Sequence, residues 1–71
     1  MEPFRLKGYK LLFSSGKRPK RFRAETHRSA FAQARLMLGI KGGRFTNKRF
    51  WAAGGKNLLY AGRQIFPRKP H

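Results

Sequence analysis

The sequence predicts an α+β fold in which one helix packs on one face of a small antiparallel sheet. Two alternating segments joined by a loop rich in turn-forming residues indicate a β-hairpin. Apolar residues recur at three- and four-residue steps over residues 27–38, which indicates an amphipathic helix. The element order is therefore β-β-α-β-β, or β-β-α-β with a short second helix. We expect residues 1–66 to form a single domain and residues 67–71 a flexible basic tail.

Strand periodicity is clearest in the N-terminal third of the chain, where successive side chains alternate between two faces. The first predicted strand spans residues 4–14, and its alternation separates Tyr9, Leu11 and Phe13 from Lys10 and Leu12. The second predicted strand spans residues 20–26, and its alternation separates Phe22 and Ala24 from Arg21, Arg23 and Glu25. The intervening segment is dense in Ser, Gly and Pro, so the two strands are predicted to pair as an antiparallel hairpin.

The best-defined predicted element is a helix over residues 27–38. Thr26 precedes it and has a hydroxyl that can accept a hydrogen bond from an N–H group of the first turn. Its apolar stripe consists of Ala30, Phe31, Ala34, Met37 and Leu38. Gly39 stands where a left-handed residue commonly ends a helix, and Ile40 can fold back onto the last turn.

The last third of the chain is ambiguous. Residues 46–53 can form a short helix that is capped by Thr46 and ended by Gly54. They can also belong to a strand over residues 45–52, which the aromatic residues of this segment favour slightly. Residues 57–66 are predicted to form one strand, with Gly62 as a bulge.

Charge is the strongest functional signal. The chain of 71 residues contains 18 Lys and Arg against two acidic residues, a net charge of +16. A small domain needs a net charge of only about 2–8 for solubility, and this excess opposes compaction by self-repulsion. A polyanion reverses the effect, because each neutralised phosphate releases condensed counterions. A hydrophobic content of 39% with 14% aromatic residues is too high for a disordered basic tail. The composition therefore predicts a folded protein that contacts nucleic acid.

Several other functions lack the residues that they need. The only acidic side chains are Glu2 and Glu25, and the only imidazoles are His27 and His71. They are too few for a paired-carboxylate or metal-dependent active site, so we expect no enzyme activity, no metal and no cofactor. The longest apolar runs are three residues, which predicts no membrane span. The chain has no Cys, which fits a reducing compartment such as the cytoplasm.

Two segments concentrate the candidate binding residues. In the first, around the predicted hairpin loop, the candidates are Lys17, Arg18, Lys20, Arg21 and Arg23, which can bind phosphates as point charges or forks. In the second, the candidates are Lys41, Arg44, Asn47, Lys48, Arg49 and Trp51. We expect at least two of the three aromatic residues in this second segment to complete the core. Trp51 is left open between a core residue and a stacking platform for a base.

The expected function is that of a small DNA-binding accessory or regulatory protein, such as one from a phage or plasmid, that acts mainly through phosphate contacts. An RNA-binding or ribosome-associated protein fits the same charge and aromatic content. A basic inhibitor or adaptor that docks on an acidic partner protein is a third possibility. The sequence leaves open the choice between DNA and RNA, the strandedness of the ligand, any sequence preference and the oligomeric state.

Overall fold

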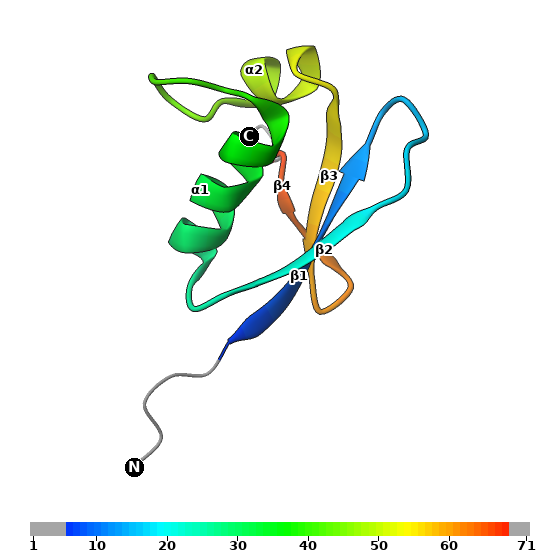
Figure 1. The fold of residues 1–71 in the computed structure, drawn as a ribbon, viewed down its shortest axis with the longest axis vertical. Coiled ribbons are helices and arrows are strands. Elements are labelled where there is room, and N and C mark those ends of the chain that lie inside the picture. The colour runs from blue at the N-terminus through cyan, green and yellow to red at the C-terminus, as the bar shows by residue number, and fades with distance from the viewer. Residues whose placement is uncertain (1–5, 69–71) are drawn as a thin grey trace.

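The computed structural model describes residues 6–68, which form four strands and two helices (Figure 1). In chain order these elements are β1 (Lys7–Phe13), β2 (Lys20–Ala24), α1 (His27–Leu38), α2 (Asn47–Ala52), β3 (Gly55–Tyr60) and β4 (Arg63–Phe66). The strands form one antiparallel sheet in the order β2-β1-β3-β4. The predicted α+β fold is confirmed.

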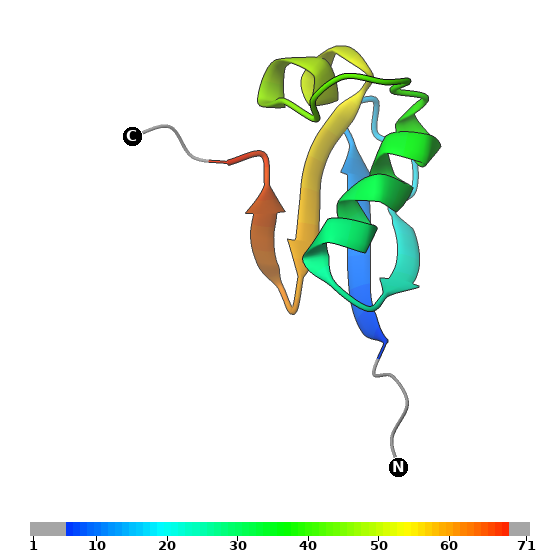
Figure 2. The same ribbon diagram turned by 90° about the vertical axis from the view of Figure 1, so that its left-hand side faces the viewer.

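The molecule has two layers. Helix α1 lies along one face of the sheet, and α2 lies at the end of the sheet where β3 begins (Figures 1 and 2). Within residues 6–68, no helix lies over the opposite face of the sheet. An uncovered face is common for antiparallel sheets, in which polar side chains occupy the exposed side. This arrangement leaves one broad sheet surface available to a ligand.

The core lies between α1 and the sheet. Leu11 and Leu58 from the strands and Ala30 and Ala34 from α1 are fully buried. The small alanine side chains suit a close approach of the helix to the sheet. At the α2 end, the core is closed by rings from four segments, namely Phe31, Phe45, Phe50 and Phe66.

Phe50 is the anchor of α2 in this core. Its side chain is fully buried, and its ring centroid lies 4.9 Å from that of Phe66. The ring also lies against the backbone at the start of β3, where a Cβ atom on Gly55 would be 2.7 Å from it. Only a residue without a side chain fits at position 55 beside this ring.

Both strands of the predicted N-terminal hairpin are present, with shorter bounds than expected. Strand β1 pairs with β2, and Tyr9 lies opposite Phe22 with the two rings stacked at 5.6 Å. The strand predicted over residues 4–14 covers Lys7–Phe13, and residues 4 and 5 lie outside the described part of the chain. The strand predicted over residues 20–26 ends at Ala24, because Thr26 serves instead as the N-cap of α1.

Helix α1 has the predicted bounds and both predicted caps. Thr26 and Ser29 form a reciprocal capping box, in which the Thr26 hydroxyl accepts the Ser29 N–H at 3.1 Å. Gly39 ends the helix with a left-handed φ of 75°. The N–H of Ile40 donates to the carbonyl of Arg35, and the Ile40 side chain is buried. These local signals explain why this element could be predicted so well.

The preferred prediction of a strand over residues 45–52 is wrong, and the helical alternative is correct. Residues Asn47–Ala52 form α2, and the Thr46 hydroxyl accepts the N–H of Arg49 at 3.2 Å. Phe50 and Trp51 separate into a fully buried and a largely exposed side chain. The cap residue outweighed the strand preference of the aromatic residues, which depends on packing context.

The prediction of one strand over residues 57–66 is also wrong. The segment forms β3 and β4, which are joined by a two-residue turn. Ala61 and Gly62 both have positive φ angles, 52° and 76°, as a type I′ hairpin turn requires. Gly62 therefore belongs to the turn, and the register irregularity lies between Leu58 and Leu59.

The start of the predicted flexible tail has defined contacts. Pro67 is buried, and the backbone N–H of Arg68 donates to Oδ1 of Asn47 at 3.0 Å. In return, Nδ2 of Asn47 donates to the Arg68 carbonyl at 2.7 Å. Residues 69–71, the rest of the predicted tail, lie outside the described residues.

Candidate nucleic-acid interface

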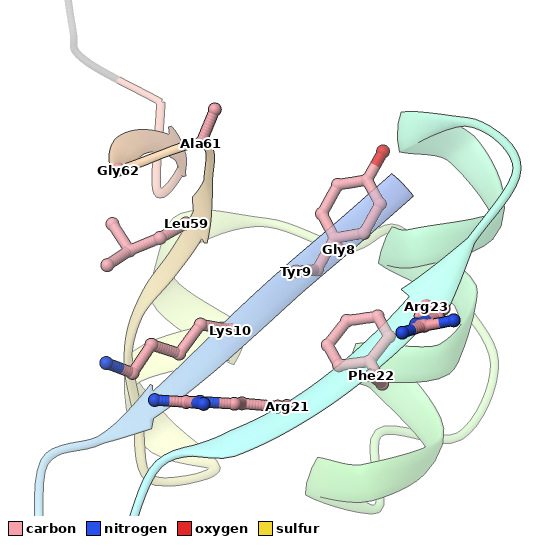
Figure 3. Close-up of a pocket in the computed structure, with 9 residues that line it drawn as sticks. All are labelled: Gly8, Tyr9, Lys10, Arg21, Phe22, Arg23, Leu59, Ala61 and Gly62. Carbon is pink, nitrogen blue, oxygen red and sulfur yellow. The ribbon is translucent and has the colours of Figure 1, made fainter. Parts of the chain in front are cut away.

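The sheet face that points away from α1, here called the open face, carries a basic surface. Strand pairing defines it, because residues directly opposite each other on antiparallel strands project to the same side. Gly8 lies opposite Arg23, and Lys10 lies opposite both Arg21 on β2 and Leu59 on β3. In Figure 3, Lys10, Arg21 and Leu59 extend in the same direction, away from α1. Tyr9 and Phe22 lie opposite each other, and their register places them on the α1 side. The open face consists of Gly8, Lys10, Leu12, Arg21, Arg23, Asn57, Leu59 and Gln64.

A hollow of about 540 Å³ lies on this face beside Gly8 (Figure 3). Its lining consists of residues from three strands and one turn, namely Gly8, Tyr9, Lys10, Arg21, Phe22, Arg23, Leu59, Ala61 and Gly62. Gly8 leaves the hollow unfilled, since a Cβ atom there would have no neighbour within 4 Å. The hollow therefore combines an open backbone floor with basic, apolar and aromatic residues.

The register of β1 and β2 places like charges together. Lys10 and Arg21 are direct cross-strand partners on the open face. Side chains in such a position have Cβ atoms about 4.5–5.5 Å apart, and two like charges there destabilise the sheet. Glu25, which is exposed beyond the end of β2, is the only acidic side chain in residues 6–68. An external anion at this position would relieve the repulsion.

The β1–β2 loop extends the basic surface beyond the sheet. Lys17 and Arg18 in the loop and Lys20 at the start of β2 are all exposed, and the loop extends to the side away from α1 (Figure 1). Its base is held to the end of α2, because the Ser14 N–H donates to the Gly54 carbonyl at 2.9 Å. Of the first predicted segment, Arg21 and Arg23 lie on the open face and Lys17 and Arg18 lie in the adjoining loop. Lys20 lies opposite Leu11 and therefore projects to the α1 side of the sheet.

The second predicted segment divides into exposed and internally engaged side chains. Lys41, Arg44 and Lys48 are exposed. Asn47 instead holds the backbone of Arg68 through its two hydrogen bonds. Arg49 is half-buried and bonded to the preceding loop. This segment lies at the same end of the sheet as the β1–β2 loop (Figures 1 and 2).

Arg49 is a clamp for the loop between α1 and α2. Its Nη1 atom donates to the carbonyls of Gly42 at 2.7 Å and Arg44 at 3.1 Å, and Nη2 donates to that of Lys41 at 3.3 Å. A planar guanidinium can bridge several carbonyls in this way, whereas an ammonium group cannot reproduce the fork. Arg49 therefore shapes the loop that presents Lys41 and Arg44.

The structure separates the three aromatic residues of this segment. Phe45 and Phe50 belong to the core, as expected for at least two of the three. Trp51 is 56% exposed on α2. The sequence left Trp51 open between a core residue and a stacking platform, and its exposure removes the first alternative.

Sequence reasoning did not select Gly8, Lys10 or Leu59 as site residues. The alternation along β1 already placed Lys10 on the other face of the strand from Tyr9. That alternation was the only sequence signal that could have identified it. Its position beside Arg21 and Leu59 became visible only through the pairing of three strands.

On the α1 side of the sheet, Tyr9 forms the main polar contact. Its hydroxyl lies 2.7 Å from Nδ1 of exposed His27, and its ring lies 5.1 Å from that of Tyr60. Burial, with a smaller contribution from Tyr60, raises the pKa of Tyr9 above its usual 10.0. His27 thus contributes to the packing of α1 on the sheet.

Two other kinds of site have no support in residues 6–68. No group of three or more metal-ligating side chains comes together there, and neither helix is long and apolar enough to cross a bilayer. Comparisons with protein families, curated protein sequences and solved structures found no match.

Proposed function

We propose that this chain is a small nucleic-acid-binding protein, with DNA as its foremost ligand and an accessory or regulatory role. It binds mainly through phosphate contacts. The observation that carries the proposal is the continuous basic surface formed by the open face and the β1–β2 loop. Lys10, Arg21 and Arg23 lie on the face, Lys17 and Arg18 in the loop adjoin it, and Lys20 at the start of β2 adds charge beside the loop. A cytoplasmic location fits this role.

Phosphate binding explains the charge distribution in physical terms. The chain carries a net charge of +16, and Lys10 and Arg21 are held side by side on a solvent-facing surface. Such an arrangement costs free energy in the isolated protein. Contact with phosphates offsets that cost and adds the entropy of released counterions. Lys41, Arg44 and Lys48 at the same end of the sheet can extend the phosphate contacts.

The test is a binding titration at several salt concentrations. A labelled DNA duplex, its single strands, a structured RNA and an acidic protein serve as probes. Contact with about 4–6 phosphates predicts a log–log slope of the association constant against salt near −4 to −5 on duplex DNA. A flat slope, or equal binding to the acidic protein, would contradict the proposal and favour the adaptor alternative.

A double variant locates the contact. Replacing Arg18→Ala and Lys20→Ala is expected to weaken binding to all DNA sequences and to reduce the salt slope by about 2. The matched control is Arg28→Ala with Arg35→Ala, which removes the same charge from α1 on the other side of the sheet. Equal losses in the two variants would show that net charge, rather than the loop, determines binding.

A further inference from the structure

We infer that the ligand is B-form duplex DNA, and that the β1–β2 ribbon enters the major groove with Arg21 and Arg23 contacting base edges. This inference rests on the proposed function and specifies both the strandedness of the ligand and the groove.

The first step is the distribution of aromatic side chains. The pairing register places Tyr9, Phe22 and Tyr60 on the α1 side of the sheet. Phe13, at the irregularity of β1, and Phe66 pack against the core. No residue of the open face is aromatic. Single-strand binders stack successive bases on aromatic rings. The two aromatic residues that border the hollow, Tyr9 and Phe22, lie on the α1 side of the sheet with their rings stacked on each other, and the exposed Trp51 lies on α2, outside the open face. A duplex needs no such platform, because its bases are already stacked.

The second step is the shape of the ribbon. Strand β2 forms one edge of the four-stranded sheet and pairs with β1, whose other side pairs with β3. The β1–β2 hairpin is thus the edge ribbon of the sheet, and it carries Lys10, Arg21 and Arg23. The major groove of B-form DNA is about 12 Å wide and admits a two-stranded ribbon. The major groove of A-form RNA is too narrow and deep for side chains to read. The ribbon therefore fits DNA rather than duplex RNA.

The third step is the chemistry beside Gly8. Arg21 and Arg23 are exposed, and both line the hollow over Gly8. An arginine fork pairs with O6 and N7 of guanine, the commonest specific contact in the major groove. Leu59 on the same hollow offers an apolar surface of the kind that contacts the methyl group of thymine. The missing side chain of Gly8 gives a base edge room to approach the sheet.

The loop supplies the complementary phosphate contacts. Lys17 and Arg18 lie beyond the ribbon, where they can bind the backbone that borders the groove. The like-charged pair of Lys10 and Arg21 then faces the acceptor atoms of the base edges. Phosphate contacts fix the position of the protein, and the two arginines provide base selectivity.

The experiment compares four labelled ligands of one sequence at fixed salt: a DNA duplex, its single strand, the corresponding RNA duplex, and the DNA duplex methylated at guanine N7. The sequence is first selected from a random duplex pool with the wild-type protein. We expect the unmodified DNA duplex to bind about tenfold or more tightly than each of the other three. Tighter or equal binding to the single strand or the RNA would overturn the inference while leaving the proposed function intact.

Charge-conserving variants test the base contacts. Arg21→Lys with Arg23→Lys keeps the charge but removes both forks. We expect this variant to lose the preference for the selected sequence and the sensitivity to N7 methylation, while its salt slope stays unchanged. The control is Arg28→Lys with Arg35→Lys on α1, which is expected to retain both properties. Unaltered selectivity in the first variant would overturn the assignment of Arg21 and Arg23. Failure of the wild-type protein to bind any of the nucleic acids would overturn the proposed function as well.

Discussion

The hydroxyl of Tyr9 lies 2.7 Å from Nδ1 of His27, and this contact joins the central part of the sheet to the first turn of α1. Tyr9 is 3% exposed, whereas His27 is an exposed residue. The contact therefore sits at the boundary between the core and the solvent. It joins α1 to the sheet beside the buried core.

Removal of this hydroxyl by Tyr9→Phe is expected to lower the free energy of unfolding by about 0.5–1.5 kcal/mol at neutral pH. The pKa of Tyr9 is raised in the folded protein, so its contribution is present below the unfolded pKa of 10.0. It is lost as the pH rises through the folded pKa. The stability difference between wild type and variant should therefore narrow above pH 10. Urea unfolding followed by circular dichroism at stepped pH measures this, and a pH-independent difference would contradict it.

Adjacent residues of α2 are expected to respond very differently to truncation. Phe50→Ala removes a fully buried ring and should cost about 3–5 kcal/mol, enough to unfold a domain of this size. Trp51→Ala removes a side chain that is 56% exposed, and stability should change by no more than about 0.5 kcal/mol. Thermal unfolding of the two variants under the same conditions compares them directly. A large loss of stability in Trp51→Ala would contradict the placement of Trp51.

The hydrogen bonds from Arg49 to the loop between α1 and α2 are expected to be lost when the guanidinium group is replaced by an ammonium group of the same charge. Arg49→Lys cannot bond the carbonyls of Lys41, Gly42 and Arg44 together, and it should lower the free energy of unfolding by about 1 kcal/mol. The loosened loop should also be cleaved faster by trypsin after Lys41 and Arg44. Exposed Lys48→Arg is the control and should leave the cleavage rate unchanged. Equal rates in both variants would show that the clamp does not order the loop.

The β3–β4 turn contains backbone strain at Ala61 that a substitution is expected to relieve. Ala61 has a φ of 52°, a region that costs a residue with a Cβ atom about 1–2 kcal/mol. Asn tolerates this conformation and is favoured before Gly in type I′ turns. Ala61→Asn is therefore expected to raise the free energy of unfolding by about 0.5–1 kcal/mol. The β-branched Ala61→Val should lower it, and a gain in both variants in urea unfolding would contradict the role of backbone strain.

Features with local causes could be predicted from the sequence. Thr26 caps α1, and Gly39 ends it through its own backbone conformation. The apolar periodicity between these two residues lies wholly within α1, so it can be recognised without knowledge of any distant contact. For the same reason, the cations of the β1–β2 loop could be identified as exposed, since charged residues in a turn-rich loop require no distant partner.

Features that depend on distant contacts could not be predicted. The strand preference of Phe50 and Trp51 was outweighed by the cap at Thr46 and by a core pocket formed with Phe66. Ala61 gave a weak turn signal, because alanine rarely adopts a positive φ. In the candidate site, Asn47 looked like a base-contacting residue, yet its side chain holds Arg68, 21 positions along the chain. Lys10 was missed because its neighbours come from two other strands.

The contact between the Phe50 ring and the backbone of Gly55 has an evolutionary consequence. A Cβ atom at position 55 would lie 2.7 Å from the ring, so neither residue can change freely while the other is retained. Divergent relatives are therefore expected to covary at these two positions, and a larger residue at 55 should accompany a smaller one at 50. Covariation of positions 50 and 55 would therefore help to identify distant homologues whose other residues have diverged.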